Sequence, residues 1–350
     1  MKPSVKPNDE LSSSTRRLAT LVRTRGRATL AFAFSGPGSP VGKIPYRTAA
    51  DDTAKVFYLA DIMGKAVEVL LDGRLGNQMF QYAFGRSLSL RLCRPLILNT
   101  SLLFREQSLA LDLRHFRLCP HRVRHWPLLP LIMRMKLLRG LASLGMGRAS
   151  VIHEPSLQFS PEVLAVGKPG VFTGYWQSER YFDSISGQLR EDLTLVAPQD
   201  ARSATCQRRI REVNSIGIHV RRADYVTKPD SNAYHGVCSK EYYDAALRLI
   251  LSRLGNGVEL FVFSDDMEWA RANLQYGLPT THVDWNLDRN YEDLRLMSSC
   301  RALIMANSSF SWWAGWLNPR PDKLVVAPRQ WYRAPGVVSD LPLSPWLVSI

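Results

Sequence analysis

The sequence predicts the α/β fold class, with two Rossmann-like domains that face each other across a cleft. Three observations predict it. Short apolar strands alternate with amphipathic helices throughout the second half, and the first half opens with the same order of strand, turn and helix. The length of 350 residues suits two domains, each large enough for its own core.

The first domain is predicted at residues 63–205. Its regular elements are expected to be a strand at 66–71, a Gly-rich turn at 73–77, a helix at 78–92 and a strand at 95–98. A weakly patterned region follows, from 101 to about 170. Residues 1–62 combine a Ser-rich run, a basic run and several Gly and Pro breakers. We therefore expect a flexible extension there and hypothesise that Met63 is the true start of the chain.

The second domain is predicted at residues 206–350, where the alternation is regular. Strands are expected at 215–220, 260–263, 281–285, 302–306 and 323–327, and helices at 240–251, 267–274, 291–299 and 309–317. Such an order forms βαβ units and a parallel sheet. Ligands bind at the carboxyl ends of the strands of such sheets, so the residues after each strand are the candidates for a site.

The chain carries 45 Lys and Arg against 31 Asp and Glu, which gives a formal net charge of +14. This excess indicates an anionic partner: a nucleic acid, an anionic membrane surface or a phosphate-bearing substrate. The apolar fraction of 45% excludes a chain that is disordered throughout, and the composition excludes a collagen-like or coiled-coil fibre. No stretch is long and apolar enough to predict a membrane span.

The five cysteines and one basic stretch have ordinary interpretations. The cysteines are far apart and form no CxxC pair, so they predict neither a zinc site nor a disulfide framework, but small buried residues in a reducing cytosol. Residues 113–153 contain no acid and eight Arg or Lys mixed with apolar residues. That mixture suits an anionic membrane surface, but we favour the alternative of a helical insertion with solvated charges.

Two adjacent arginines, Arg221 and Arg222, follow the strand at 215–220. Guanidinium groups bind phosphate oxygens bidentately and can neutralise a leaving diphosphate. The pair therefore suits a phosphate-bearing ligand. The alternative is a surface pair bonded to neighbouring carboxylates.

Ser264, Asp265 and Asp266 follow the strand at 260–263. A carboxylate there can accept hydrogen bonds from a ribose hydroxyl or a purine N–H, or ligate a divalent cation. The alternative is a helix cap, because Asp at the start of a helix satisfies free backbone N–H groups.

Asn307, Ser308 and Ser309 follow the strand at 302–306 and open a helix. Free N–H groups at such a helix start bind anions, and ordinary capping is the alternative. We assign the tryptophans of this helix to the core. The turn at 73–78 occupies the equivalent place in the first domain, although a lone Gly-rich turn is a weak signal.

Five ordered motifs resemble those of the bacterial and animal α-1,2-fucosyltransferases, glycosyltransferase family 11. They are GRLGNQMFQYA at 73–83, GYWQS at 174–178, HVRRADYV at 219–226, FVFSDD at 261–266 and ANSSFSWW at 306–313. The resemblance implies a GT-B-like fold whose C-terminal domain holds the nucleotide-sugar donor. It also implies transfer of L-fucose from GDP-β-L-fucose to the 2-hydroxyl of a galactoside, with inversion to an α-linkage.

The resemblance further implies a role for each motif residue. Arg221 would bind the β-phosphate with support from Arg222, and His219 with Asp265 or Asp266 would contact the nucleoside. The remaining donor contacts are expected at Ser264, Asn307, Ser308 and Ser309, and the other substrate contacts at Gly76, Asn77, Gln78, Tyr175 and Trp176. We expect no metal and no other cofactor.

Inversion by direct displacement needs a group that takes the acceptor proton. Asp224 is the nearest motif carboxylate and our candidate, with orientation of Arg221 as its alternative role. Asn77 is expected to reach from the facing domain toward the sugar. Arg221, Asp224 and Asn77 are therefore the predicted catalytic residues.

The expected partners are GDP-fucose and a galactose-containing glycan, including a lipid-linked one. Animal members of the family carry an N-terminal span, so its absence from this sequence favours a bacterial cytoplasmic enzyme. We expect it to build surface polysaccharide or O-antigen, with peripheral contact at the inner face of an anionic membrane. The alternatives are a transferase for another nucleotide sugar or a protein acceptor and, from charge alone, a nucleic-acid-binding protein, for which no binding module is seen.

Overall fold

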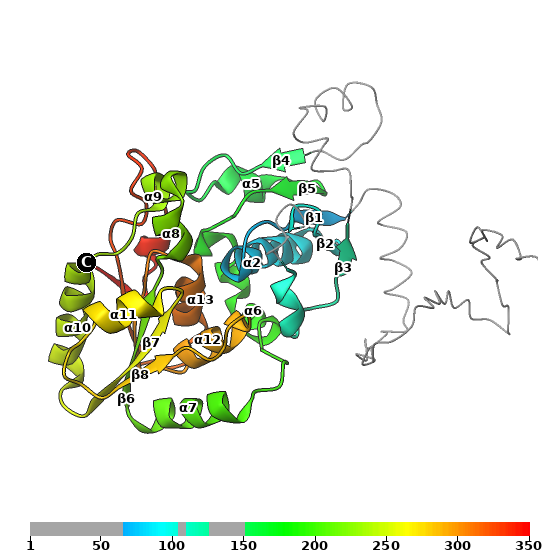
Figure 1. Cartoon of the computed structure of the whole chain (residues 1–350). Helices are drawn as coiled ribbons and strands as arrows, with labels where there is room; N and C mark the ends of the chain where they lie inside the picture. The colour runs from blue at the N-terminus through cyan, green and yellow to red at the C-terminus, as the bar shows by residue number, and fades with distance from the viewer. Residues whose placement is uncertain (1–65, 104–109, 126–150) are drawn as a thin grey trace, which may run out of the picture. The chain divides into compact units, whose positions relative to one another are not determined.

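The computed structural model describes residues 66–103, 110–125 and 151–350, all within the compact unit Ala50–Ile350. These residues form two β-sheets with flanking helices (Figure 1). The predicted α/β, GT-B-like class with two Rossmann-like halves is confirmed. The predicted extension at 1–62 and the central part of the acid-free stretch, residues 126–150, lie outside the described residues.

The first sheet has the order β3-β2-β1-β5-β4, and every neighbouring pair is parallel. Its strands are β1 (Val67–Leu70), β2 (Leu96–Asn99), β3 (Arg122–Arg124), β4 (Val151–His153) and β5 (Gly170–Thr173). The two strands predicted in this half are β1 and β2. The sequence does not predict β3, β4 and β5, because they lie in or at the end of the region from 101 to about 170, where no regular pattern is visible.

The main helix of this half is α2 (Leu75–Leu92), which begins three residues before its predicted start. Gly73 turns the chain directly after β1 with a φ of +76°. The N–H groups of Asn77 and Gln78 then donate to the carbonyl oxygen of Arg74 at 3.0 and 3.1 Å. Both residues therefore lie on the first turn of a helix and not in a loop. The smaller helices are η2 (Asp112–His115), α5 (Pro161–Ala165), η3 (Glu179–Tyr181), η4 (Asp183–Ile185) and α6 (Ser186–Asp192).

The second sheet has the order β11-β10-β9-β6-β7-β8 and is also parallel. Its strands are β6 (Asn214–Val220), β7 (Val258–Ser264), β8 (Thr280–Val283), β9 (Ala302–Ile304), β10 (Leu324–Ala327) and β11 (Val348–Ser349). All five strands predicted for this half are present within one to two residues of their expected ends. The two-residue β11 is too short to be predicted.

The helices of the second half match their predictions closely. They are α7 (Ala201–Glu212), α8 (Ala223–Thr227), α9 (Pro229–His235), α10 (Lys240–Leu254), α11 (Met267–Asn273), α12 (Asn290–Met297), α13 (Ser309–Leu317) and the short η5 (Leu341–Leu343). Of these, the sequence does not predict α7, α8, α9 and η5. The domain boundary predicted after residue 205 falls inside α7, and the division of the chain at that residue stays a prediction.

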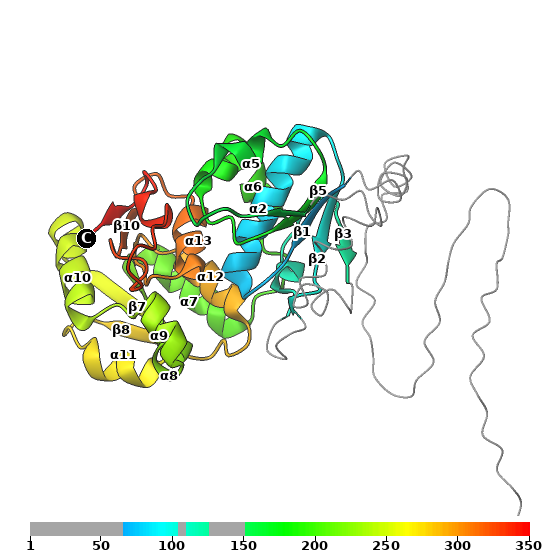
Figure 2. The same ribbon diagram turned by 90° about the horizontal axis from the view of Figure 1, so that it is seen from above.

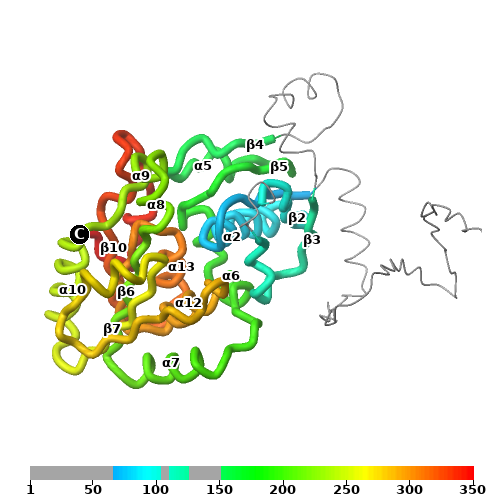
Figure 3. The backbone as a smooth tube through the Cα atoms, in the orientation of Figure 1, coloured from blue at the N-terminus to red at the C-terminus, as the bar shows by residue number. Residues whose placement is uncertain are grey.

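Helices α2 and α13 join the two halves and lie side by side in two views (Figures 2 and 3). The Phe80 ring of α2 lies 4.7 Å from the ring of Trp312 and 4.8 Å from that of Trp313. The indole Nε1 of Trp313 donates to the carbonyl oxygen of Gly76 at 3.1 Å. Trp312, Trp313 and Trp316 are buried, which confirms their assignment to the core.

A second contact joins η2 of the first half to α12 of the second. The rings of His115 and Tyr291 stack with centroids 4.0 Å apart, and Nδ2 of Asn290 donates to Oδ2 of Asp112 at 3.3 Å. One hydrophobic cluster contains buried residues of both halves. The two sheets therefore share part of one hydrophobic core.

Two smaller sequence predictions concern membrane spans and cysteines. Within the described residues, no helix is long and apolar enough to cross a bilayer. All five cysteines are free thiols. Four of them, Cys119, Cys206, Cys238 and Cys300, are buried as predicted, whereas Cys93 is exposed and ends α2.

Gly76 tests the contact between α2 and α13. A Cβ added there would lie 2.6 Å from the backbone nitrogen of Phe310 and from Oγ of Ser309. Gly76→Ala is therefore expected to lower the free energy of unfolding by about 1–3 kcal/mol, measured by chemical denaturation. The control is Gly187→Ala in α6, where no atom lies within 4 Å of the added Cβ. A Gly76→Ala protein as stable as the wild type would contradict the close packing.

Candidate functional site

Three neighbouring strands of the second sheet bring the predicted donor residues to one edge. Val220 of β6 pairs with Ser264 of β7, and Ile218 of β6 pairs with Ile304 of β9. Because these strands are parallel, the segments that follow them all emerge at the carboxyl edge. The strand-end rule, by which the residues that follow the strands of a parallel sheet are the candidates for a site, therefore identifies residues that lie together. The contacts of these residues distinguish their roles.

Arg221 follows β6 and is held by two carboxylates. Its Nη1 donates to Oδ2 of Asp265 at 2.5 Å, and its Nη2 donates to Oδ1 of Asp224. Its guanidinium carbon lies 5.2 Å from the centre of the Tyr225 ring. A guanidinium has five N–H donors, so these two ion pairs fix its orientation without using all of them.

Arg222 is also oriented by neighbouring groups. Its Nε donates to Oδ2 of Asp266 at 3.2 Å, and its guanidinium carbon lies 4.2 Å from the centre of the Trp269 ring. Its backbone N–H donates to Oδ1 of Asp265 at 2.7 Å. Both arginines are thus bonded to neighbouring carboxylates, as the alternative interpretation of the sequence predicts. These bonds hold both guanidinium groups at the end of β6.

Asp265 and Asp266 both have structural partners. Asp265 accepts from the backbone N–H of Ala223 at 3.2 Å as well, and so fixes the start of α8. Asp266 caps α11 by accepting from the N–H of Trp269 at 3.1 Å, and its own N–H donates to Oγ of Ser264 at 2.9 Å. The capping alternative is therefore confirmed for Asp266. Among the described residues, no three His, Cys, Asp or Glu side chains are grouped to hold a metal ion, and the expected absence of a metal stays a prediction.

His219 is a buried histidine near the end of β6 with one unused ring nitrogen. Its Nδ1 has no hydrogen-bond partner among the described residues, and its ring lies 5.6 Å from that of Phe310. Burial lowers the pKa of His219 to about 4; the charge of Asp265 has a smaller effect that raises it, and the charge of Arg221 lowers it further. The imidazole is therefore neutral at pH 7 and has a polar atom that a ligand could use.

Asn307, Ser308 and Ser309 have three different roles. Nδ2 of Asn307 donates to the carbonyl oxygens of His235 at 2.9 Å and Trp331 at 3.2 Å. This buried amide ties α9 to the segment after β10, so the prediction that Asn307 contacts the donor does not agree with its partners. Ser308 is the N-cap of α13, as the capping alternative predicts. Ser309 contacts the first half of the chain.

Asn77 lies at the junction of the two carboxyl edges. Its Oδ1 accepts from Oγ of Ser309 at 3.0 Å and from Nε2 of Gln177 at 2.9 Å. Oε1 of Gln177 in turn accepts from the hydroxyl of Tyr332 at 3.3 Å. These hydrogen bonds link the segments after β1 and β5 to those after β9 and β10.

Two predicted substrate contacts are contradicted by burial. Gln78 is fully buried, and its Nε2 donates to the carbonyl oxygens of Gly73 at 3.0 Å and Ala110 at 2.7 Å, which uses both of its N–H groups. Trp176 is fully buried and stacks on Phe84 with ring centroids 4.0 Å apart. Both residues therefore support the fold. Tyr175, by contrast, has 38% of its surface exposed.

Glu154, which no sequence motif identifies, follows β4 at the carboxyl edge of the first sheet. Its Oε2 accepts from the N–H of Tyr175 at 2.7 Å, and its Oε1 accepts from that of Trp176 at 2.8 Å. Burial raises the pKa of Glu154 to about 7, although these N–H groups favour the charged form. The residue lies in the weakly patterned region, where only its position after a three-residue strand could have identified it.

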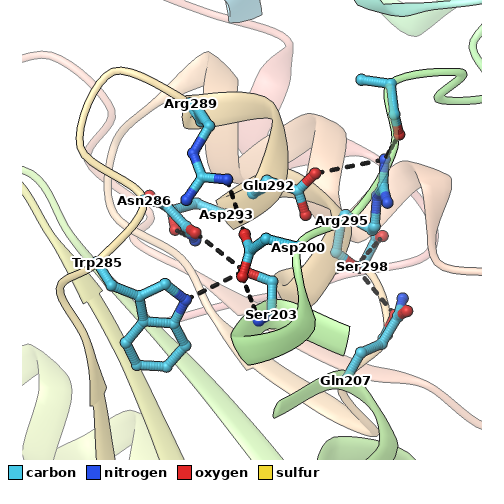
Figure 4. A network of polar contacts seen from close by, with 12 residues as sticks. Asp200, Ser203, Gln207, Trp285, Asn286, Arg289, Glu292, Asp293, Arg295 and Ser298 are labelled. Atoms are coloured by element: carbon cyan, nitrogen blue, oxygen red, sulfur yellow. Dashed lines mark hydrogen bonds and ion pairs between the residues drawn. The ribbon is translucent and has the colours of Figure 1, made fainter. Parts of the chain in front are cut away.

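A second polar network anchors the connection between the two halves (Figure 4). Oγ of Ser203 accepts from Nε1 of Trp285 at 3.0 Å and donates to Oδ1 of Asn286 at 3.1 Å. Asp200 caps α7 and accepts from Nη1 of Arg289 at 2.7 Å. The network thus fixes α7 against the segment between β8 and α12, and we assign it a structural role.

The family profile and the similar proteins of known sequence agree on one family. The profile of glycosyl transferase family 11 matches residues 155–346. The O-antigen biosynthesis glycosyltransferase WbnK of Escherichia coli is 32% identical over 311 residues, which cover 79% of this chain and 98% of that protein. The alpha-1,2-colitosyltransferase of Escherichia coli is 32% identical over 283 residues, which cover 75% of this chain and 91% of that protein.

Solved structures give weaker matches. The fucosyltransferase NodZ from Bradyrhizobium aligns with a TM-score of 0.39 and 14% identity, over 71% of this chain and 93% of that one. The ADP-heptose heptosyltransferase II of Escherichia coli aligns with a TM-score of 0.42 and 15% identity, over 81% of this chain and 90% of that one.

His219 predicts a specific loss of stability in acid. Its folded-state pKa of about 4 lies below the ordinary value of 6.5, so the neutral ring stabilises the fold above pH 6.5 and this contribution is lost as the pH falls toward 4. Between pH 7 and pH 5 this amounts to about 2 kcal/mol. Urea unfolding at pH 7 and pH 5 should therefore show that the free energy of unfolding falls less for His219→Gln than for the wild type. An equal decline in both proteins would contradict the buried, neutral histidine.

Proposed function

Because the chain belongs to glycosyltransferase family 11, we propose that it transfers L-fucose from GDP-β-L-fucose to the 2-hydroxyl of a galactoside, with inversion to an α-1,2 linkage. The observation that carries this proposal is Arg221, held by Asp265 and Asp224 at the carboxyl end of β6. A fixed guanidinium at that edge suits the diphosphate of a nucleotide sugar. The similarity to a relative named for O-antigen biosynthesis supports a role in surface polysaccharide synthesis.

The donor is proposed to bind at the carboxyl edge of the second sheet. Arg221 would contact the β-phosphate, with Arg222 beside it. The N-terminus of α13 would offer the backbone N–H of Ser309 and the hydroxyl of Ser308 to the same phosphates, because the N–H of Ser308 already donates to the carbonyl oxygen of Ala306 at 2.8 Å. His219 would contact the nucleoside, which its buried and unpartnered Nδ1 supports.

Leaving-group stabilisation is the main contribution that we propose for these residues. Breaking the bond between the sugar and the β-phosphate leaves negative charge on GDP, and donors that are already oriented stabilise that charge without reorganisation. Asp265 supplies this orientation because it binds Arg221 and the backbone of the next residue together. No step in this scheme requires a metal.

The acceptor proton is proposed to pass to Asp224. Its Oδ1 accepts from Arg221, so the same carboxylate both orients the guanidinium and lies at the strand end. Asn77, which the first half brings to Ser309, would position the sugar from the opposite side. The new bond forms between the acceptor oxygen and the anomeric carbon, and the electron pair of the broken bond leaves with GDP.

A second donor is favoured by one specific observation. A relative of 32% identity is named as an alpha-1,2-colitosyltransferase, and colitose is fucose without its 3-hydroxyl. GDP-colitose is therefore the alternative donor. We also propose that the acceptor includes lipid-linked glycans and that the enzyme works in the cytoplasm at the inner face of the membrane.

An assay with purified protein tests this proposal. GDP-fucose, GDP-colitose, GDP-mannose and UDP-galactose are each offered with a panel of galactosides and with a protein acceptor, and the product linkage is determined by NMR. We expect an α-1,2-linked 6-deoxy sugar on galactose. A product from mannose or from the UDP sugar, or a modified protein, would contradict the proposal.

Arg221→Ala tests the residue that carries the proposal. We expect transfer to fall by about 10²–10³-fold, because the charge on departing GDP loses its fixed donor. Arg221→Lys keeps the charge but loses the planar guanidinium that can bind two phosphate oxygens at once, and should recover only part of the rate. The control is Arg209→Ala, which also removes an ion pair, to Glu259 at the start of β7. An Arg221→Ala enzyme with more than a tenth of wild-type activity would contradict the role.

A further inference from the structure

We propose that the acceptor glycan binds across an aromatic platform formed by Tyr225, Tyr234, His235 and Tyr332, with Tyr234 as its main stacking surface. This inference rests on the proposed function and adds where the second substrate lies. The platform takes the apolar C–H face of a neutral pyranose such as galactose. Nothing in the motif resemblance assigns Tyr234, His235 or Tyr332.

The rings of the platform form a continuous cluster. Tyr225 and His235 stack with centroids 4.5 Å apart and planes within 1° of parallel. Tyr234 packs edge-on against His235 at 4.9 Å and against Tyr332 at 5.1 Å. These contacts join α8, α9 and the segment after β10 into one aromatic surface.

This surface begins beside the proposed donor phosphate site. Tyr225 lies under the guanidinium of Arg221. His235 stacks on the same Tyr225 ring, so the start of the cluster lies at Arg221. An acceptor on the platform would therefore present a hydroxyl near the proposed site of sugar transfer.

The platform also reaches the first half of the chain. The hydroxyl of Tyr332 donates to Gln177, whose Nε2 donates to Asn77. The aromatic cluster thus bridges Arg221 on one side and Asn77 on the other, which are the two sides of the proposed reaction.

Exposure distinguishes a binding surface from ordinary packing. Tyr332 is only 8% exposed, but Tyr234 is 39% exposed although it belongs to the same cluster. The segments that carry these rings are already held together by the amide of Asn307, which bonds the carbonyl oxygens of His235 and Trp331. The fold therefore does not need the Tyr234 ring to hold α9 against the segment after β10.

An open surface depression lies along the same segments, but the platform rings themselves do not line it. Its lining includes Val226, Ala233 and Arg333, which are the chain neighbours of Tyr225, Tyr234 and Tyr332. The Nη1 of Arg333 donates to Oδ1 of Asn232 at 2.8 Å, so polar groups border the segments that carry the rings.

Tyr234→Ala tests the platform, with Tyr234→Phe as the matched control that keeps the ring. We expect Tyr234→Ala to raise the KM for the galactoside acceptor about tenfold, which corresponds to about 1.4 kcal/mol. The KM for the donor and the slow acceptor-free hydrolysis of GDP-fucose should stay within twofold of the wild type. Tyr234→Phe should behave as the wild type, because stacking needs the ring and not the hydroxyl.

Saturation-transfer NMR with the galactoside gives a readout that does not depend on turnover. We expect the ring protons of galactose to receive magnetisation from the wild type and from Tyr234→Phe, and much less from Tyr234→Ala. An unchanged acceptor KM and an unchanged NMR signal in Tyr234→Ala would overturn the platform while the transferase proposal stands. A wild type that transfers no sugar from any donor would overturn both.

Discussion

The contact between α2 and α13 is the constraint on which the rest of the structure depends. Trp313 donates its indole N–H to the carbonyl oxygen of Gly76, and only a residue without a side chain allows the two helices to approach so closely there. One residue further on, Asn77 accepts a hydrogen bond from Ser309. The same contact that closes the hydrophobic interface therefore brings the carboxyl edges of the two parallel sheets together.

A second constraint is the set of carboxylates around Arg221 and Arg222. Asp224, Asp265 and Asp266 hold the two guanidinium groups, and Asp265 also bonds the backbone at the start of α8. Long cationic side chains lose considerable entropy when a ligand orders them. Here the protein has already ordered them, so binding a diphosphate would not require that cost again.

The sequence predicts the fold better than it predicts the role of each motif residue. Alternating strands and helices locate the second sheet to within about two residues, and the strand-end rule correctly groups Arg221, Asp265 and Ser308. The motif resemblance is less exact for Gln78, Trp176 and Asn307, because buried polar and aromatic residues that hold loops in place occur in the same motifs as residues that face a ligand. Glu154 and Tyr234 are missed because their segments contain only short elements, and only the folded chain places them near the site.

A crystal structure with bound GDP tests the central claim most directly. Our account predicts that the diphosphate lies within hydrogen-bonding distance of the Arg221 guanidinium and of Ser309 at the start of α13, with the nucleoside against His219. It also predicts that α2 and α13 keep their contact at Gly76 and Trp313. A diphosphate bound elsewhere, or separation of the two helices on binding, would contradict the account.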